Sequence, residues 1–475
     1  MGKSSEGSVH LLERNKTILT DKKILCLVDG EHYPPVTKWT LEEIRRLDGF
    51  IVSLVFLGGT EKVENAVEEL GGDDADHVVY MDKGDDSLPL DLLEKAIQET
   101  APKIVLDLSD EPVVDYRRRF NLICRTLKHG VTYMGADFVY DPPREEDVLE
   151  KPSISIIGTG KRVGKTSVGV TVARILKERD FDPVVVCMGR GGPPEPDYVD
   201  TSKMEMSPDT LISVAERGGH AASDYWEDAL LGDVPTVGCR RCGGGMAGNP
   251  FSSNVLQGAR MTNRIPQKFV VMEGSGATFP PVKTDRRIVL VGAGQPIEHI
   301  TGYLGEYRIL TSHLAIVTMC EEPVADEPKV DAVYKGIKRI NPDIDIALTV
   351  FRPKPLGDIR GKKVFIATTA KGEVADIIEK SVREDYDCDV TGITTHLSNR
   401  PLLRKDLREG LAESDVLLTE IKAASIDVAA VTAKNHGVEI VFMHNEPVLV
   451  GGTVENLDKA VIDLCKEAKR RHTDG

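Results

Sequence analysis

The sequence has no apolar segment long enough to cross a membrane. A spanning helix needs roughly 18 or more consecutive apolar residues. The apolar run at 50–59 is much shorter and ends in glycines. Residues 1–16 also lack the hydrophobic core of a secretory signal peptide. These absences predict a cytoplasmic protein.

The chain also lacks the excess of basic residues that nucleic-acid-coating proteins carry. It has 76 acidic and 60 basic side chains, which gives a net charge of −16. We therefore expect neither nucleic acid nor an anionic membrane as a partner. A local basic pocket for a phosphorylated small molecule remains compatible with this balance. The length of 475 residues predicts about two to four domains.

Cysteine motifs of the zinc-binding kind are missing. The eight cysteines are scattered, and Cys239 and Cys242 form a lone C-x-x-C with no second pair nearby. Two reduced loop cysteines are the simplest interpretation, and a zinc or redox role stays open as the alternative.

A strand, a glycine-rich loop and a helix follow one another at residues 154–168, which read ISIIGTGKRVGKTSV. Glycines let the backbone approach a polyphosphate, and N–H groups at the helix N-terminus attract it. This order predicts an ATP-binding phosphate loop, with Lys165 on the β- and γ-phosphates and Thr166 on Mg²⁺. The residues expected to bind the nucleotide are Gly158, Thr159, Gly160, Lys161, Arg162, Val163, Gly164, Lys165, Thr166 and Ser167.

A second acidic position follows a strand in the same region. The apolar run FVVM ends at Glu273, and Gly-Ser-Gly comes next. An acid at the end of a strand beside a phosphate loop commonly orders Mg²⁺. We therefore expect Thr166 and Glu273 to hold the metal; a buried structural carboxylate is the alternative.

Arginines and glycines are concentrated in two loops of this otherwise acidic chain. Glycine-rich backbone can form an anion nest, and arginine binds phosphate in a bidentate manner. This composition favours a phosphorylated substrate over a plain surface loop. The expected substrate-binding residues are Arg190, His220, Arg240, Arg241, Gly243 and Gly244.

Apolar strands alternate with helical stretches along the chain, which predicts an α/β fold with parallel sheets. After a polar lead-in (1–20), we expect an N-terminal Rossmann-like domain (21–148) with a helix near 61–72. A central P-loop NTPase domain with a parallel sheet (151–340) and a C-terminal α/β region (341–475) follow. The first domain lacks G-x-G-x-x-G, so no dinucleotide is assigned to it.

The C-terminal region either extends the central sheet or forms a separate lobe. Polar residues after its strands, such as Lys422, are surface residues in the simplest interpretation. Substrate contact is the alternative for these positions.

Several motifs carry a resemblance to known enzymes. The loop GTGKRVGKTSV is one residue longer than G-x-x-x-x-G-K-[ST] and resembles the GT-x-x-x-VGKT loop of dethiobiotin synthetases. The stretch EGSG at 273–276 likewise resembles the E-G-A-G of these enzymes. With CRRCGGGMAGNPF at 239–251 and the N-terminal domain, these motifs resemble the cyclic 2,3-diphosphoglycerate synthetase family over nearly the whole chain.

This resemblance implies an archaeal ATP-dependent ligase. It would close 2,3-bisphosphoglycerate into an intramolecular phosphoanhydride and release ADP and phosphate. Phosphoryl transfer depends on positioning and charge neutralisation, so the expected catalytic residues are Lys165, Lys161, Arg240 and Arg241.

Two other functions stay open. One is a ligase of the same superfamily that acts on a carboxylate, as dethiobiotin synthetase does; the added terminal regions and the arginine pair count against it. The other is a non-enzymatic switch in which ATP closes a dimer. Because relatives with this kind of loop often dimerise, we expect a homodimer.

Overall fold

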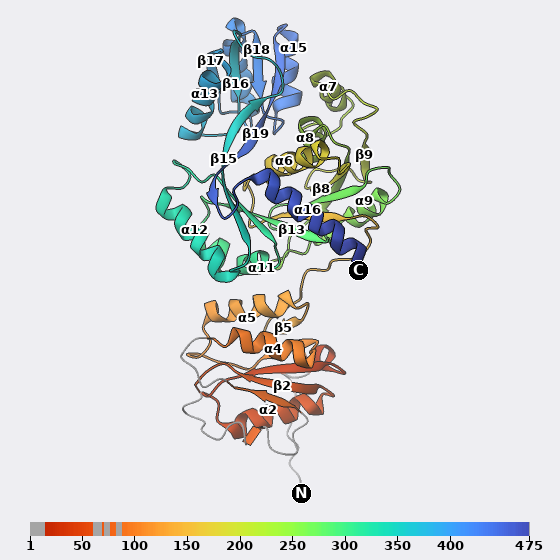
Figure 1. The fold of residues 1–475 in the computed structure, drawn as a ribbon, viewed down its shortest axis with the longest axis vertical. Coiled ribbons are helices and arrows are strands. Elements are labelled where there is room, and N and C mark those ends of the chain that lie inside the picture. The colour runs from red at the N-terminus through yellow and green to blue at the C-terminus, as the bar shows by residue number, and fades with distance from the viewer. Residues whose placement is uncertain (1–14, 60–68, 71–76, 82–87, 475) are drawn as a thin grey trace. The chain divides into compact units, whose positions relative to one another are not determined.

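The computed structural model describes residues 15–59, 69–70, 77–81 and 88–474. The chain divides into two compact units. The first unit contains residues 1–142 together with 301–311, and the second contains residues 143–300 and 312–475. Each unit is built around its own sheet with helices packed against it (Figure 1).

The first unit has a six-stranded sheet with the order β3-β2-β1-β4-β5-β6, parallel except for the β5–β6 pair. The expected helix near 61–72 lies almost entirely outside the described residues. The helix α11 packs against α5 in this unit. Its elements are β1 (Lys23–Val28), α2 (Pro34–Arg46), β2 (Phe50–Phe56), β3 (Val78–Tyr80), α4 (Leu90–Thr100), β4 (Ile104–Asp107), α5 (Tyr116–Lys128), β5 (Thr132–Met134), β6 (Val139–Tyr140) and α11 (Gly305–Leu310).

The second unit has a thirteen-stranded sheet with the order β11-β10-β8-β12-β7-β13-β14-β15-β19-β18-β16-β17, and β9 pairs with β10. The strands are β7 (Ser153–Gly158), β8 (Pro183–Gly189), β9 (Asp197–Val199), β10 (Thr236–Cys242), β11 (Ser252–Ser253), β12 (Phe269–Glu273), β13 (Arg286–Gly292), β14 (Leu314–Thr318), β15 (Asp345–Pro355), β16 (Lys363–Ala367), β17 (Asp389–Thr394), β18 (Val416–Thr419) and β19 (Glu439–Gly452).

The long strands β15 and β19 form an antiparallel ribbon that joins two parallel parts of this sheet. β15 pairs with β14 of the central part, and β19 pairs with β18 of the C-terminal part. The C-terminal region therefore extends the central sheet. We call strands β16, β17 and β18 with their helices the C-terminal lobe.

Helices cover the strands of the second unit. They are α6 (Lys165–Glu178), α7 (Pro208–Glu216), α8 (Asp224–Gly232), α9 (Val255–Thr262), α10 (Ile297–Thr301), α12 (Glu327–Ile340), α13 (Glu373–Tyr386), α14 (Arg400–Gly410), α15 (Val431–Asn435) and α16 (Leu457–Asp474). A 3₁₀ turn (Leu411–Glu413) and a π-helix (Ser425–Ala430) complete the lobe.

The central strands are buried on both faces, as their continuous apolar runs predict. Val184 and Val186 of β8 face a core that includes residues of α9. Val185 and Cys187 face the opposite core, to which α6, α8 and α16 contribute. Each fully buried valine or leucine stabilises the fold by about 1.5–3 kcal/mol, so this double burial gives the phosphate loop a rigid base.

The C-x-x-C pair lies on strand β10 and not in a loop, contrary to the expectation. Cys239 is buried and Cys242 is exposed, and both are free thiols. Because they lie three positions apart on a strand, their side chains point to opposite faces. This geometry disfavours one shared zinc ion. In the part of the chain that the structure describes, no helix is long and apolar enough to span a membrane.

Candidate active site

The phosphate loop connects buried β7 to α6, as predicted. Gly164 adopts φ +78°, and a Cβ there would lie 2.3 Å from Phe351 Cζ of β15. A Cβ on Gly158 would lie 3.0 Å from the Lys165 ammonium and 3.1 Å from the carbonyl oxygen of Gly276. Gly164 therefore requires glycine for its left-handed backbone and its contact with Phe351, and Gly158 leaves little room for a side chain.

Gln295 holds the longer phosphate loop through Thr159 and Gly160. No sequence motif identifies this glutamine. The Thr159 hydroxyl donates to Gln295 Oε1 at 2.6 Å, and the Gly292 amide donates to the same oxygen at 3.1 Å. Gly160 also fits closely, because a Cβ there would lie 2.7 Å from Gln295 Nε2. Gln295 thus ties the loop to the end of β13.

Lys165 folds back over the loop, where its ammonium donates to the Gly160 carbonyl at 3.0 Å. The pKa of Lys165 is lowered to about 8, mainly by burial, and the nearby guanidinium groups of Arg190 and Arg241 contribute in the same direction. Glu273 and Asp224 act in the opposite direction. Burial therefore outweighs the attraction of these acids, and a buried lysine with a lowered pKa is typical of a functional site.

Glu273 ends β12 next to α6, and its carboxylate is fully buried. A Cβ on Gly169 would lie 1.5 Å from Glu273 Oε1, so this glycine makes room for the carboxylate. Gly169 lies three residues after Thr166, which places both on one face of α6. Glu273 Oε1 has no hydrogen-bond partner among the described residues. Thr166 thus lies on the face of α6 against which the Glu273 carboxylate packs.

Three acids of α8 lie near Glu273 and interact with it electrostatically. Only Asp224 was noted from the sequence. Asp224, Glu227 and Asp228 lie at i, i+3 and i+4, so they share a helix face. Cys187 donates its thiol hydrogen to Asp228 Oδ2 at 2.9 Å. Acids at this spacing on the otherwise apolar helix DYWEDALLG are the signal that could have identified them.

Burial, together with repulsion from neighbouring carboxylates, raises the pKa of Asp228 and of Glu273 well above the ordinary values. Cys187, Asp228 and Glu273 each offer one ligand atom within 4.8 Å of the others. Burial also raises the pKa of the Cys187 thiol, so it stays protonated. A hard cation here would bind carboxylate oxygen and replace the proton that the two acids retain.

Arg190 and Arg241 converge on the loop after Glu273. A Cβ on Gly276 would lie 2.9 Å from Arg190 Nη2 and 3.5 Å from Arg241 Nη2. Arg241 donates to the carbonyl oxygens of Ser275 (2.9 Å) and Gly243 (2.8 Å), and its Nε has no partner among the described residues. Burial, with Arg190 nearby, lowers the pKa of Arg241.

Arg240 has a different environment. Its Nε donates to the carbonyl oxygens of Gly192 (3.0 Å) and Pro193 (2.7 Å), so it fixes the loop that carries Arg190. Neighbouring residues of a strand point to opposite faces, and Arg240 and Arg241 accordingly make separate contacts.

The remaining predicted residues surround this centre. His220 is exposed; it interacts electrostatically with Asp224, and its ring lies 3.4 Å from a Cβ placed on Gly191. A Cβ added at Gly244 would lie 2.8 Å from Thr278 Oγ1 and 3.4 Å from Arg241 Nη1. Lys161 and Arg162 are exposed on the phosphate loop, whereas Val163 and Ser167 are buried beneath it.

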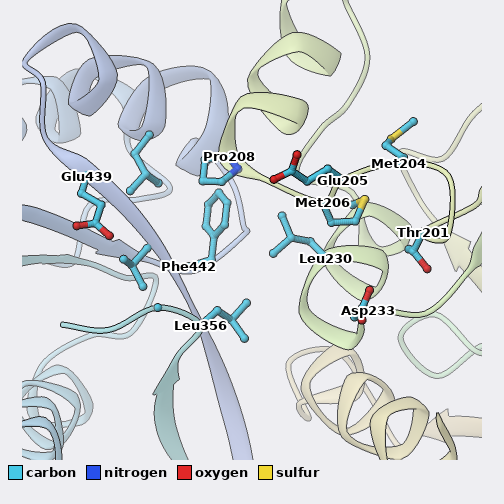
Figure 2. A pocket seen from close by; sticks show the side chains of 13 residues that line it. Thr201, Met204, Glu205, Met206, Pro208, Leu230, Asp233, Leu356, Glu439 and Phe442 are labelled. Carbon is cyan, nitrogen blue, oxygen red and sulfur yellow. The ribbon is translucent and has the colours of Figure 1, made fainter. Parts of the chain in front are cut away.

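A cavity of about 480 Å³ lies elsewhere in the second unit (Figure 2). Met206, Leu230 and Phe442 are among its apolar lining residues, and Glu205, Asp233 and Glu439 are its acids. Its lining contains no lysine, arginine or histidine. A polyanionic substrate would gain no cation there, so the chemistry belongs to the phosphate loop.

Family models cover the chain in three consecutive parts. Those of the cyclic 2,3-diphosphoglycerate synthetase match its N-terminal domain at residues 23–141, its P-loop domain at 153–350 and its C-terminal domain at 355–446. The chain belongs to the cyclic 2,3-diphosphoglycerate synthetase family. The family and the α/β fold with parallel sheets predicted from the sequence are confirmed, and the loop at 158–167 lies within the part of the chain that the P-loop domain model matches.

Curated relatives agree over almost the full length. The chain is 48% identical to the cyclic 2,3-diphosphoglycerate synthetase of Methanothermus fervidus, over 94% of this chain and 97% of that protein. It is 46% identical to the enzyme of that name from Methanothermobacter thermautotrophicus, over 94% of this chain and 96% of that protein. The corresponding protein of Rubrobacter xylanophilus is 43% identical, over 94% of this chain and 98% of that protein.

Among solved structures, LpxK from Aquifex aeolicus in complex with ATP is 13% identical. The match covers 68% of this chain and 90% of that chain, with a TM-score of 0.41.

Proposed function

We propose that this chain is an ATP-dependent ligase that closes 2,3-bisphosphoglycerate into cyclic 2,3-diphosphoglycerate, with release of ADP and phosphate. The observation that carries the proposal is the membership of all three parts of the chain in one synthetase family. The complete phosphate loop, with Lys165 folded over it, supports ATP as the phosphoryl donor.

Mg²⁺ fits the site as a companion of ATP. Glu273 Oε1 has no hydrogen-bond partner among the residues that the structure describes, and Thr166 lies on the same face of α6 as Gly169, which makes room for this carboxylate. Hydroxyl and carboxylate oxygens are the ligands that Mg²⁺ prefers. Bound there, Mg²⁺ would neutralise charge on the β- and γ-phosphates.

The reaction requires two phosphoryl transfers. In the first, an oxygen of one substrate phosphate attacks the γ-phosphorus of ATP, and the bond to ADP breaks. In the second, an oxygen of the other substrate phosphate attacks the first substrate phosphorus, and inorganic phosphate leaves. Neither step needs a covalent enzyme intermediate, so positioning and charge neutralisation supply the catalysis.

The cations around the loop suit this chemistry. Lys165 would hold the β- and γ-phosphates, while Arg190 from the loop after β8 and Arg241 near the end of β10 would bind the acceptor phosphates. Lys161, exposed on the phosphate loop, would add charge as the substrate arrives. Arg240 would act by fixing the Arg190 loop, through its contacts with Gly192 and Pro193.

The test is ³¹P NMR of the purified protein with ATP, Mg²⁺ and 2,3-bisphosphoglycerate. We expect anhydride-type resonances to appear together with ADP and phosphate in equal amounts. ATP hydrolysis without such a product would refute the cyclisation. ATPase activity that responds only to a protein would instead favour the nucleotide switch. Light scattering after size-exclusion chromatography tests the expected homodimer.

A further inference from the structure

Lys422 of the C-terminal lobe reaches the acids beside the phosphate loop. It follows β18, whose neighbours in the sheet are β16 and β19. Its ammonium lies 3.7 Å from Glu227 Oε1 of α8, and it also interacts electrostatically with Asp224. Asp224 in turn interacts with Lys165 of the phosphate loop. One acidic helix therefore connects the two lysines.

The lobe holds Lys422 by a fixed network. Glu420, two residues before it, is buried and accepts hydrogen bonds from the hydroxyls of Thr368 (2.8 Å) and Thr369 (2.8 Å) and from Asn445 Nδ2 (3.3 Å). Burial alone would raise the pKa of Glu420, but Lys422 and these hydrogen bonds lower it. The carboxylate thus stays charged and keeps the lysine at the site.

Lys422 nevertheless retains capacity for another anion. A separation of 3.7 Å is long for a hydrogen bond, and 34% of its side chain is exposed, against 5% for Glu227. Because Glu227 is the more buried partner, burial raises its pKa to about 7 despite the attraction of Lys422. The same carboxylate raises the pKa of the more accessible Lys422 to about 12. The lysine is therefore charged at neutral pH, and its partly exposed side chain is accessible to a further anion.

We propose that Lys422 binds a phosphate of the acceptor substrate and that Glu227 positions it for this task. The inference rests on the proposed function. The phosphate loop already supplies backbone N–H groups and Lys165 for ATP, whereas the acceptor brings two phosphates of its own. Arg190 comes from the loop after β8 and Arg241 from the end of β10, and Lys422 is a cation that the C-terminal lobe adds. The lobe is then part of the active site.

The test compares Lys422→Met with Lys422→Arg and with a control, Lys434→Met. Lys434 lies in the same lobe, and its ion pair with Asp209 is exposed. We expect Lys422→Met to raise the KM for 2,3-bisphosphoglycerate at least tenfold and the KM for ATP less than threefold. Lys422→Arg should recover most of the loss, and Lys434→Met should match the wild type. A KM for the bisphosphate within twofold of wild type in Lys422→Met would overturn the proposal.

A second variant separates substrate binding from folding. Lys422→Met leaves Glu227 as an uncompensated buried acid, which lowers stability. The double variant Lys422→Met/Glu227→Gln removes that acid, so its unfolding temperature should recover while the KM for the bisphosphate stays raised. Recovery of both would show a purely structural lysine and overturn the proposal.

A direct measurement of substrate binding tests the role of Lys422 independently of the proposed reaction. Absence of cyclic product from the wild-type enzyme would refute the proposed function alone. Isothermal titration of 2,3-bisphosphoglycerate into wild type and Lys422→Met then decides the lysine's role. At least tenfold weaker binding to the variant supports the proposal, and equal affinity overturns it.

Discussion

Replacing Lys165 by methionine should abolish turnover without weakening the fold. In the free enzyme burial lowers the pKa of this lysine from 10.5 to about 8. Keeping the ammonium charged in the folded site therefore costs roughly 3 kcal/mol. Methionine has a similar length and carries no charge, so the variant avoids most of this cost.

The assay pairs turnover, followed by ³¹P NMR, with thermal unfolding. We expect cyclisation to fall by at least about 10²–10³-fold, since removing one preorganised donor has effects of this size. The unfolding temperature should rise by a few degrees. Lys177→Met is the matched control, because Lys177 lies on the same helix and pairs with exposed Asp233; its turnover should not change.

The pH dependence gives a further check. The unfolded chain binds the lysine proton more tightly than the folded one, so the cost is fully present below about pH 8 and disappears as the pH rises towards 10.5. The stability advantage of Lys165→Met should therefore shrink between pH 7 and pH 9.5. A variant with turnover within tenfold of wild type, or one clearly less stable at pH 7, would refute this reasoning.

Four further predictions concern the metal and substrate residues. Glu273→Gln should raise the Mg²⁺ concentration needed for half-maximal turnover at least tenfold, measured by Mg²⁺ titration. Binding of Mg²⁺ and ATP should release protons, because the pKa of Glu273 is raised; calorimetry in buffers of different ionisation enthalpy measures this, and no buffer dependence would contradict it. Gly169→Ala should lower turnover at least tenfold in a fold that stays intact by circular dichroism, because its Cβ would displace Glu273. Arg241→Met and, less strongly, Arg240→Met should raise the KM for the bisphosphate more than that for ATP in steady-state kinetics, and equal effects on both would count against the assignment.

The parts of the site that are local in sequence could be predicted from it. The phosphate loop is continuous along the chain, and glycine spacing, Lys165 and Thr166 identify it without tertiary information. Glu273 could also be predicted from the sequence, because a buried strand that ends in an acid is a local pattern. These features, with the flanking motifs, also sufficed to predict the family.

The contacts made at long range could not be predicted in this way. Gln295 lies 136 residues after Thr159, and nothing in its surroundings distinguishes it. Lys422 follows an ordinary strand, and its role depends on Glu227 of another element. Whether the C-terminal region extended the sheet or stood apart was also open, because strand order depends on pairings such as β15 with β19.

The last helix of the second unit has a consequence for synthesis on the ribosome. Helix α16 packs against α6, β7 and β13, and Val461, Leu464 and Cys465 belong to the core beneath the phosphate loop. It is translated only after the whole C-terminal lobe. The nucleotide-binding domain therefore cannot complete its core when residues 153–350 leave the ribosome. The apolar surface that α16 covers stays exposed until this helix, more than one hundred residues later, has been translated. Truncation after the lobe would leave that face open to chaperones and proteases.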